Sequence, residues 1–154
     1  MTARRLGLAL AAAVALLGAR RAAANTCSFS AVTGVAFGSY NVFDTAPVVA
    51  AGGFTYECTG VGASDQITIE LGGDTDATVL RAMASGANTL SYQLYLDAPR
   101  TVVWGNGTGG TATYGPVHPA NATPTSVSIF GRIPARQDAV PGSYHDTVVI
   151  TVNF

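Results

Sequence analysis

The residues with the most reactive side chains are few, because this 154-residue chain contains two cysteines and two histidines. Cys27 and Cys58 form an even pair, which in an exported protein predicts a disulfide bond. Closing a loop of about 30 residues would stabilise the fold by about 3–4 kcal/mol on the loop-entropy model. A metal site at the cysteines is the alternative, but His118 and His145 lack ligand spacing to them.

Hydrolytic enzymes need a nucleophile beside a general base, and the sequence offers no such set. His145 precedes Asp146, but neighbouring residues of a strand point to opposite faces, so these two side chains cannot form a dyad there. His118 lies between prolines in a stretch rich in glycine and threonine. The sequence therefore predicts no catalytic residue, no enzymatic activity and no cofactor.

Two other patterns have the letters of a ligand site without its surroundings. Gly105–Gly110 matches the glycine-rich loop of dinucleotide-binding proteins, but Pro116 and Pro119 follow where that loop needs a helix. Asp74 and Asp76 share a face if the chain is extended, yet calcium requires six or more oxygens. We therefore expect loops at both places, with no nucleotide and no metal.

Aromatic residues in and beside the stretch 105–126 suggest a different kind of site. This stretch is rich in glycine, threonine and proline, which predicts a long mobile loop at one end of the fold. Trp104, Asn106 and Tyr114 lie in or next to it and could form a stacking surface for a carbohydrate. Packing in the core or at an interface is the commoner fate of such rings, so both interpretations stay open.

The first 24 residues have the three parts of a secretory signal peptide. Arg4 and Arg5 precede an apolar run from Leu6 to Leu17, and small residues then predict cleavage after Ala24. The run is shorter than the roughly 20 residues that span a membrane. We therefore expect one exported domain, residues 25–154, that crosses the inner membrane to the periplasm and then reaches the cell surface or the medium.

Charge argues against nucleic acid as a partner. The whole chain has eight basic and nine acidic residues, and Arg4, Arg5, Arg20 and Arg21 belong to the predicted signal peptide. The remaining domain is therefore acidic, whereas a protein that binds phosphate backbones needs a basic face.

Short alternating runs separated by glycine, proline, asparagine and aspartate predict an all-β sandwich or barrel. The runs are Cys27–Val32, Val35–Tyr40, Gly53–Thr59, Gln66–Leu71, Thr89–Leu96, Thr101–Trp104, Ser126–Ile133 and Tyr144–Phe154. Thr78–Ser85 reads as irregular structure or an edge strand. Gly52-Gly53, Asp97–Arg100 and Pro141-Gly142 predict turns between strands.

The end of the chain, PGSYHDTVVITVNF, is its most specific pattern. Together with the Phe37-Gly-x-Tyr40 pattern, the cysteine pair and YQLYLD leading to WGNG, it makes Cys27–Phe154 resemble the spore coat protein U domain. That family is similar to subunits of archaic chaperone–usher pili. The resemblance implies a secreted, immunoglobulin-like, pilin-type antiparallel β-sandwich that is incomplete because it lacks its final strand.

The missing strand of such subunits leaves a hydrophobic groove beside the C-terminal strand. The resemblance implies that a periplasmic chaperone fills it first and that, at an outer-membrane usher, the N-terminal extension of a neighbouring pilus subunit replaces the chaperone. The recipient strand here would be Tyr144–Phe154. Its groove face would carry Tyr144, Asp146, Val148, Ile150, Val152 and Phe154.

The front of the predicted domain departs from the pattern of polymerising subunits. Only Asn25 and Thr26 precede Cys27, and two extended residues reach about 7 Å, too short for a donor strand. We therefore expect a subunit that receives a strand without giving one, at a pilus tip or as an accessory or terminating component. The alternative is a secreted surface-adhesion or carbohydrate-binding module that acts as a monomer.

Overall fold

The computed structural model describes residues 24–72 and 76–154. The predicted signal peptide up to residue 23, and Asp74, lie outside the described residues. The secondary-structure elements of the described residues are all β-strands, as the alternating pattern predicted. No helix in these two ranges is long and apolar enough to cross a membrane.

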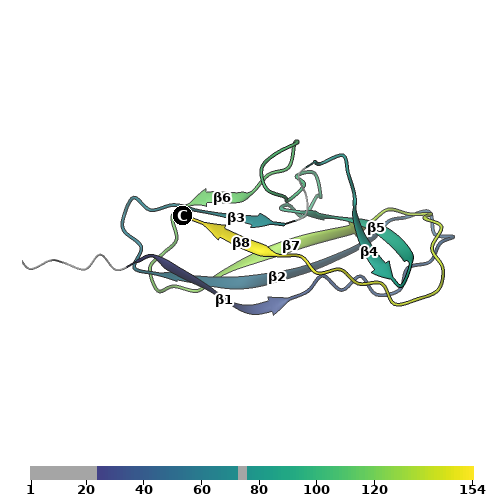
Figure 1. Cartoon of the computed structure of the whole chain (residues 1–154), viewed down its shortest axis with the longest axis horizontal. Coiled ribbons are helices and arrows are strands. Elements are labelled where there is room, and N and C mark those ends of the chain that lie inside the picture. Colours follow the sequence, from purple (N-terminus) through teal and green to yellow (C-terminus); the bar gives the residue numbers. More distant parts are fainter. Residues whose placement is uncertain (1–23, 73–75) are drawn as a thin grey trace, which may run out of the picture.

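The strands form two antiparallel sheets (Figure 1). Their bounds are β1 Thr26–Thr33, β2 Val48–Thr59, β3 Ile67–Leu71, β4 Arg81–Ser85, β5 Asn88–Tyr95, β6 Tyr114–Val117, β7 Thr125–Ile133 and β8 Ile150–Asn153. The larger sheet has the order β1-β2-β7-β5-β4, and the smaller sheet has the order β6-β3-β8.

Alternation along the strands explains why the two sheets pack together. In β3, Ile67, Ile69 and Leu71 are buried while the residues between them are half-buried, and β7 buries Val127 and Ile129 in the same way. Successive side chains of a strand point to opposite faces, so each strand contributes one row to the core. The core therefore lies between the sheets, and its other buried members include Phe54, Tyr56, Met83, Leu90, Tyr92, Leu94, Trp104 and Ile133.

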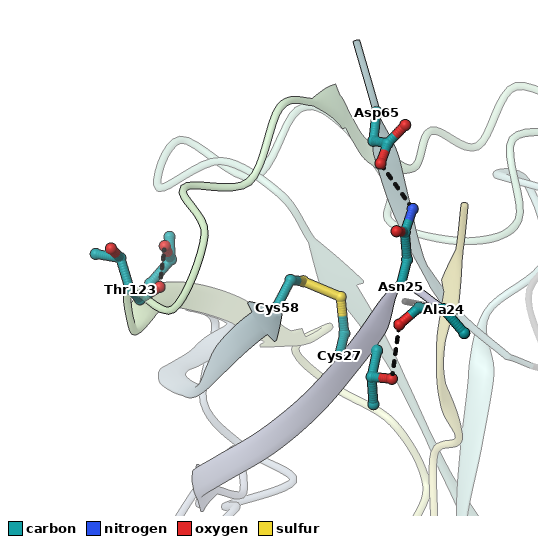
Figure 2. The surroundings of a disulfide bond; sticks show 8 residues. Ala24, Asn25, Cys27, Cys58, Asp65 and Thr123 are labelled. Atoms are coloured by element: carbon teal, nitrogen blue, oxygen red, sulfur yellow. Dashed lines mark hydrogen bonds between the residues drawn. A yellow bond between two sulfur atoms is a disulfide. The ribbon is translucent and has the colours of Figure 1, made fainter. Parts of the chain in front are cut away.

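The predicted disulfide bond is confirmed. Cys27 of β1 lies directly opposite Cys58 of β2 and is bonded to it (Figure 2). The two residues are 31 positions apart, so the bond stabilises the fold by about 3–4 kcal/mol on the loop-entropy model. Beside it, the Asn25 side chain donates a hydrogen bond to Asp65 at 2.8 Å, which ties the start of β1 to the loop before β3.

Two predicted segments, a turn and a loop, are wrong. Gly52 and Gly53 do not form a turn but lie inside β2, where a Cβ would come within 2.6 Å of Thr33 O and 2.5 Å of Val127 O. Glycine is needed there because the backbones of β1 and β7 approach closely. The predicted mobile loop 105–126 contains β6, which pairs with β3, so tertiary pairing orders part of a sequence with little pattern.

Other predicted elements have different outcomes. Thr78–Ser85 contains β4, an edge strand, as one of its two interpretations expected. Val35–Tyr40 and Thr101–Trp104 are not strands, although both sequences alternate. The second segment makes only isolated bridges, through Val103 and Trp104.

The predicted turn at Asp97–Arg100 is present, with the Arg100 amide donating to Asp97 O at 3.0 Å. The Asp97 carboxylate accepts further hydrogen bonds from the Thr101 hydroxyl and from the amides of Thr101 and Val102. These bonds, led by that from the Thr101 side chain, lower the pKa of Asp97 below its ordinary value. Asp97 therefore holds the loop more strongly when it is ionised.

We expect Asp97→Asn to make folding less sensitive to acid. A carboxyl group whose pKa is lower in the folded state stabilises the fold above its unfolded pKa of about 3.9 and loses this effect as the pH falls through the folded pKa. Urea unfolding between pH 6 and pH 3 measures the effect. The wild-type free energy of unfolding should fall more steeply below pH 4 than that of the variant, and equal slopes would contradict the role given to Asp97.

Candidate functional site

Strand β8 lies at the edge of the smaller sheet and pairs on one side only with β3. Ile150 is opposite Leu71, Val152 is opposite Ile69, and the Gly72 amide donates to Val149 O at 2.8 Å. Backbone groups alternate in direction along an antiparallel strand, so those of Ile150 and Val152 face away from β3. Within the described ranges, no strand pairs with that second edge.

The predicted strand Tyr144–Phe154 is shorter in the structure. Only Ile150–Asn153 forms a ladder, because the preceding residues cross from one sheet to the other. At the start of the crossing, His145 and Ala84 of β4 exchange two backbone hydrogen bonds of 2.9 and 3.1 Å. The C-terminal segment therefore touches both sheets, as the yellow chain of Figure 1 shows.

Side chains of this segment alternate between two environments. Val148, Ile150 and Val152 are half-buried and pack against the core, whereas Val149 is 64% exposed. Phe154, the last member of the predicted groove face, is 61% exposed and lies outside the core cluster. The inward apolar row therefore ends at Val152.

A groove of about 1090 Å³ lies beside this row. Its floor is apolar and comes from both sheets. The floor residues are Leu71, Met83, Leu90, Tyr92, Leu94, Ile129 and Ile133. One wall is the segment 32–42 and the other is the segment 139–146 with Val148 and Ile150, and we call them the N-terminal wall and the C-terminal wall.

Contacts with β7 and β5 position the N-terminal wall. Val35 and Phe37 lie over Gly131 of β7 so closely that a Cβ there would be 2.6 Å from each side chain. The Phe37 ring also packs edge-on against Tyr92, with ring centroids 5.9 Å apart. Gly38 has a φ of 72°, which glycine adopts without strain.

A polar group closes part of the C-terminal wall. The Tyr92 hydroxyl donates to the Asp146 carboxylate at 2.6 Å. Burial, followed by this hydrogen bond, raises the pKa of Tyr92 well above its ordinary value. Arg81 of β4 donates to Gly72 O at 2.7 Å and to Leu71 O at 3.3 Å, which joins the larger sheet to the end of β3 beneath β8.

Two of the residues considered for catalysis, Asp146 and His118, form hydrogen bonds with other parts of the fold. Asp146 accepts its side-chain hydrogen bond from Tyr92, and the His118 ring lies 2.7 Å from Asp65 O. The part of the chain that the structure describes contains no group of three or more His, Cys, Asp or Glu residues that could hold a metal.

The aromatic surface suggested for a carbohydrate is not present at Trp104. This residue is completely buried, and its Nε1 donates to Ile69 O at 2.9 Å, so its ring belongs to the core. Tyr114 is half-buried and packs on Trp104 with ring centroids 6.2 Å apart. Asn106 accepts hydrogen bonds from the amide and hydroxyl of Thr108, which shape its own loop.

The architecture is an all-β fold of two antiparallel sheets. The family model described as Spore Coat Protein U domain matches residues 13–151, and the chain belongs to this family. It is 42% identical over 84 residues to Protein U of Myxococcus xanthus, an alignment that covers 53% of this chain and 45% of that protein. The chain thus matches less than half the length of this relative.

A solved structure supports the fold. The chain is similar to one chain of the CsuC–CsuE chaperone–tip adhesion subunit pre-assembly complex from archaic chaperone–usher Csu pili of Acinetobacter baumannii. The TM-score is 0.55 at 20% identity, and the match covers 85% of this chain and 40% of the other.

Proposed function

We propose that this protein is a secreted structural subunit whose groove receives a β-strand from another chain. The observation that carries the proposal is the open edge of β8 directly beside the apolar groove. A strand added there would pair with the backbone of Ile150 and Val152 and would place alternate side chains over the groove floor. The inserted strand would complete the sandwich, so assembly would need no covalent chemistry.

Size and shape favour a polypeptide over a small molecule. The groove volume of about 1090 Å³ is at the upper limit of the roughly 300–1,000 Å³ that is usual for small-ligand pockets. Its lining comes largely from two long chain segments, 32–42 and 139–146, and from an apolar floor, and its charged or titratable residues include His145 and Asp146. An exposed strand edge beside an apolar surface is also the arrangement that invites strand addition.

The N-terminal wall supports the same proposal. The sequence Val35–Tyr40 alternates like a strand, and its Val35 and Phe37 side chains lie over Gly131 of β7 in the larger sheet. In the described residues, however, it pairs with no strand. An inserted strand would lie between this wall and β8. We propose that the N-terminal wall and β8 each form backbone hydrogen bonds with the inserted strand. This would explain why Val35–Tyr40 has the alternation of a strand but is unpaired without a partner chain.

The partners follow from the family and the fold. We propose a periplasmic chaperone as the first occupant, an outer-membrane usher as the assembly site, and neighbouring pilus or coat subunits as the final occupants. The disulfide bond and the likeness to a pilus subunit support an extracytoplasmic location. A position at the tip or as an accessory subunit depends on signal cleavage after Ala24, which N-terminal sequencing of the mature protein would test.

A structural role is also preferred over enzymatic activity and over the adhesion module. The family is one of coat and pilus subunits, which are generally not enzymes. Burial of Trp104 removes the ring on which carbohydrate stacking depended.

Peptide addition tests the proposal. We expect a synthetic peptide of alternating valine and threonine to stabilise the purified domain by about 2.7 kcal/mol at a hundredfold excess over its Kd. Hydrogen exchange should slow at the Ile150 and Val152 amides, while the Thr151 amide, which faces β3, should change little.

The control is a peptide of the same composition with its valines in one block, which cannot place them on one face of a strand. The proposal fails if neither the alternating peptide nor a cognate chaperone alters the unfolding midpoint or these two amides.

A further inference from the structure

One tyrosine hydroxyl joins the N-terminal wall of the groove to the segment that leads into the C-terminal wall. Tyr40, at the end of the alternating part of the N-terminal wall, donates to Pro134 O at 2.9 Å. The same hydroxyl accepts a hydrogen bond from the backbone amide of Gln137 at 2.7 Å. Gln137 lies just before the C-terminal wall, so this oxygen holds two segments that are almost a hundred positions apart.

The Gln137 side chain ties this junction to the groove floor. Its Oε1 accepts from the Ser91 amide at 2.8 Å and its Nε2 donates to Ser91 O at 2.7 Å. Ser91 lies in β5 between Leu90 and Tyr92, which both line the floor. A second bond of 3.2 Å runs from Nε2 to Pro134 O.

A proline in the partner segment explains why the Gln137 side chain, and not a backbone group, bonds Ser91. The ladder between β5 and β7 pairs Gln93 with Arg132, and the same register two residues further along would bring Ser91 opposite Pro134. Proline has no amide hydrogen to donate, so the ladder stops there. The side-chain amide of Gln137 carries both a donor and an acceptor. It replaces the missing backbone group and keeps the Ser91 backbone hydrogen-bonded.

We propose that Tyr40 and Gln137 are positioning residues that set the separation of the two walls and keep the groove preformed for an incoming strand. The inference rests on the proposed function. A chain whose binding-competent state is only partly populated binds more weakly by that fraction, so a wall that leaves its place lowers affinity without removing any contact to the strand. The junction prevents this loss because it connects the N-terminal wall, the segment that leads into the C-terminal wall, and β5 at the floor.

The test uses Tyr40→Phe, which removes the hydroxyl and keeps the ring. Tyr95→Phe is the matched control, because it also removes one hydroxyl and Tyr95 lies in β5 outside the groove lining. We expect exchange of the backbone amides of Gln137, which loses its acceptor, and of Ser91 to become about tenfold faster in Tyr40→Phe, in line with the loss of about one neutral hydrogen bond. Exchange within β2 should stay at its wild-type rate.

The same variants are titrated with the alternating valine–threonine peptide. We expect the affinity of Tyr40→Phe to fall by about threefold to tenfold and that of Tyr95→Phe to stay within twofold. Gln137→Met, which removes the amide at similar length, should resemble Tyr40→Phe. Unchanged or tighter binding in both Tyr40→Phe and Gln137→Met, beside a wild type that binds, would overturn the positioning role alone. If the wild type binds no strand, the proposed function fails and the positioning role with it.

Discussion

Ile150→Lys should abolish strand capture, while Val149→Lys should leave it nearly intact. Ile150 is half-buried in the inward row of the C-terminal wall and lines the groove, whereas the neighbouring Val149 is 64% exposed. A lysine at position 150 would have to be covered by the inserted strand without a partner for its charge. We expect affinity for the alternating peptide or for a chaperone to fall by at least about a hundredfold, or about 2.8 kcal/mol.

The pair of variants separates capture from folding. Both add the same charge one residue apart, so a general effect of lysine on solubility or net charge appears in both. Circular dichroism and urea unfolding of each variant alone would report any loss of the fold, and calorimetric titration would report binding. Equal binding by the two variants would mean that the added strand does not lie over Ile150.

Trp104→Ala should be the most destabilising of the single substitutions considered. The ring is completely buried, packs against Phe54 with centroids 6.2 Å apart, and donates its Nε1 hydrogen to Ile69 O. Its removal leaves a cavity between the sheets and an unpaired carbonyl, and such substitutions cost about 3–5 kcal/mol. Urea unfolding followed by far-ultraviolet circular dichroism measures this loss.

Trp104→Phe gives the matched comparison, because it keeps most of the apolar ring and loses the hydrogen bond to Ile69. We expect an intermediate loss of about 1–3 kcal/mol. A ligand-stacking tryptophan would behave differently, since its replacement would weaken binding while leaving the free energy of unfolding almost unchanged. That second outcome would restore the surface interpretation of Trp104.

Local sequence was sufficient wherever one period repeats within one strand. Ile67, Ile69 and Leu71 predicted a strand with one buried face, because side chains of a strand alternate whatever the rest of the fold does. The disulfide bond could also be predicted from the sequence, since two cysteines allow one intramolecular pairing. The inward row Val148, Ile150 and Val152 was also evident from its period.

Contacts between distant segments decided the rest. Trp104 followed a short apolar run and preceded a glycine-rich stretch, and only the packing of Phe54 and Tyr114 around it shows that it belongs to the core. Gly52 and Gly53 were predicted to form a turn because paired glycines are common in turns. Only the paired strands show that β1 approaches Gly52 closely and that β7 approaches Gly53 closely.

The sequence by itself determined which side chains can share a face, because that depends on residue spacing alone. Tertiary structure decided which of these faces have a partner. Val35–Tyr40 and Tyr144–Phe154 both alternate, yet only Ile150–Asn153 forms a ladder, because strand pairing requires a second backbone at hydrogen-bonding distance. The structure places the two incompletely paired segments on either side of one apolar groove.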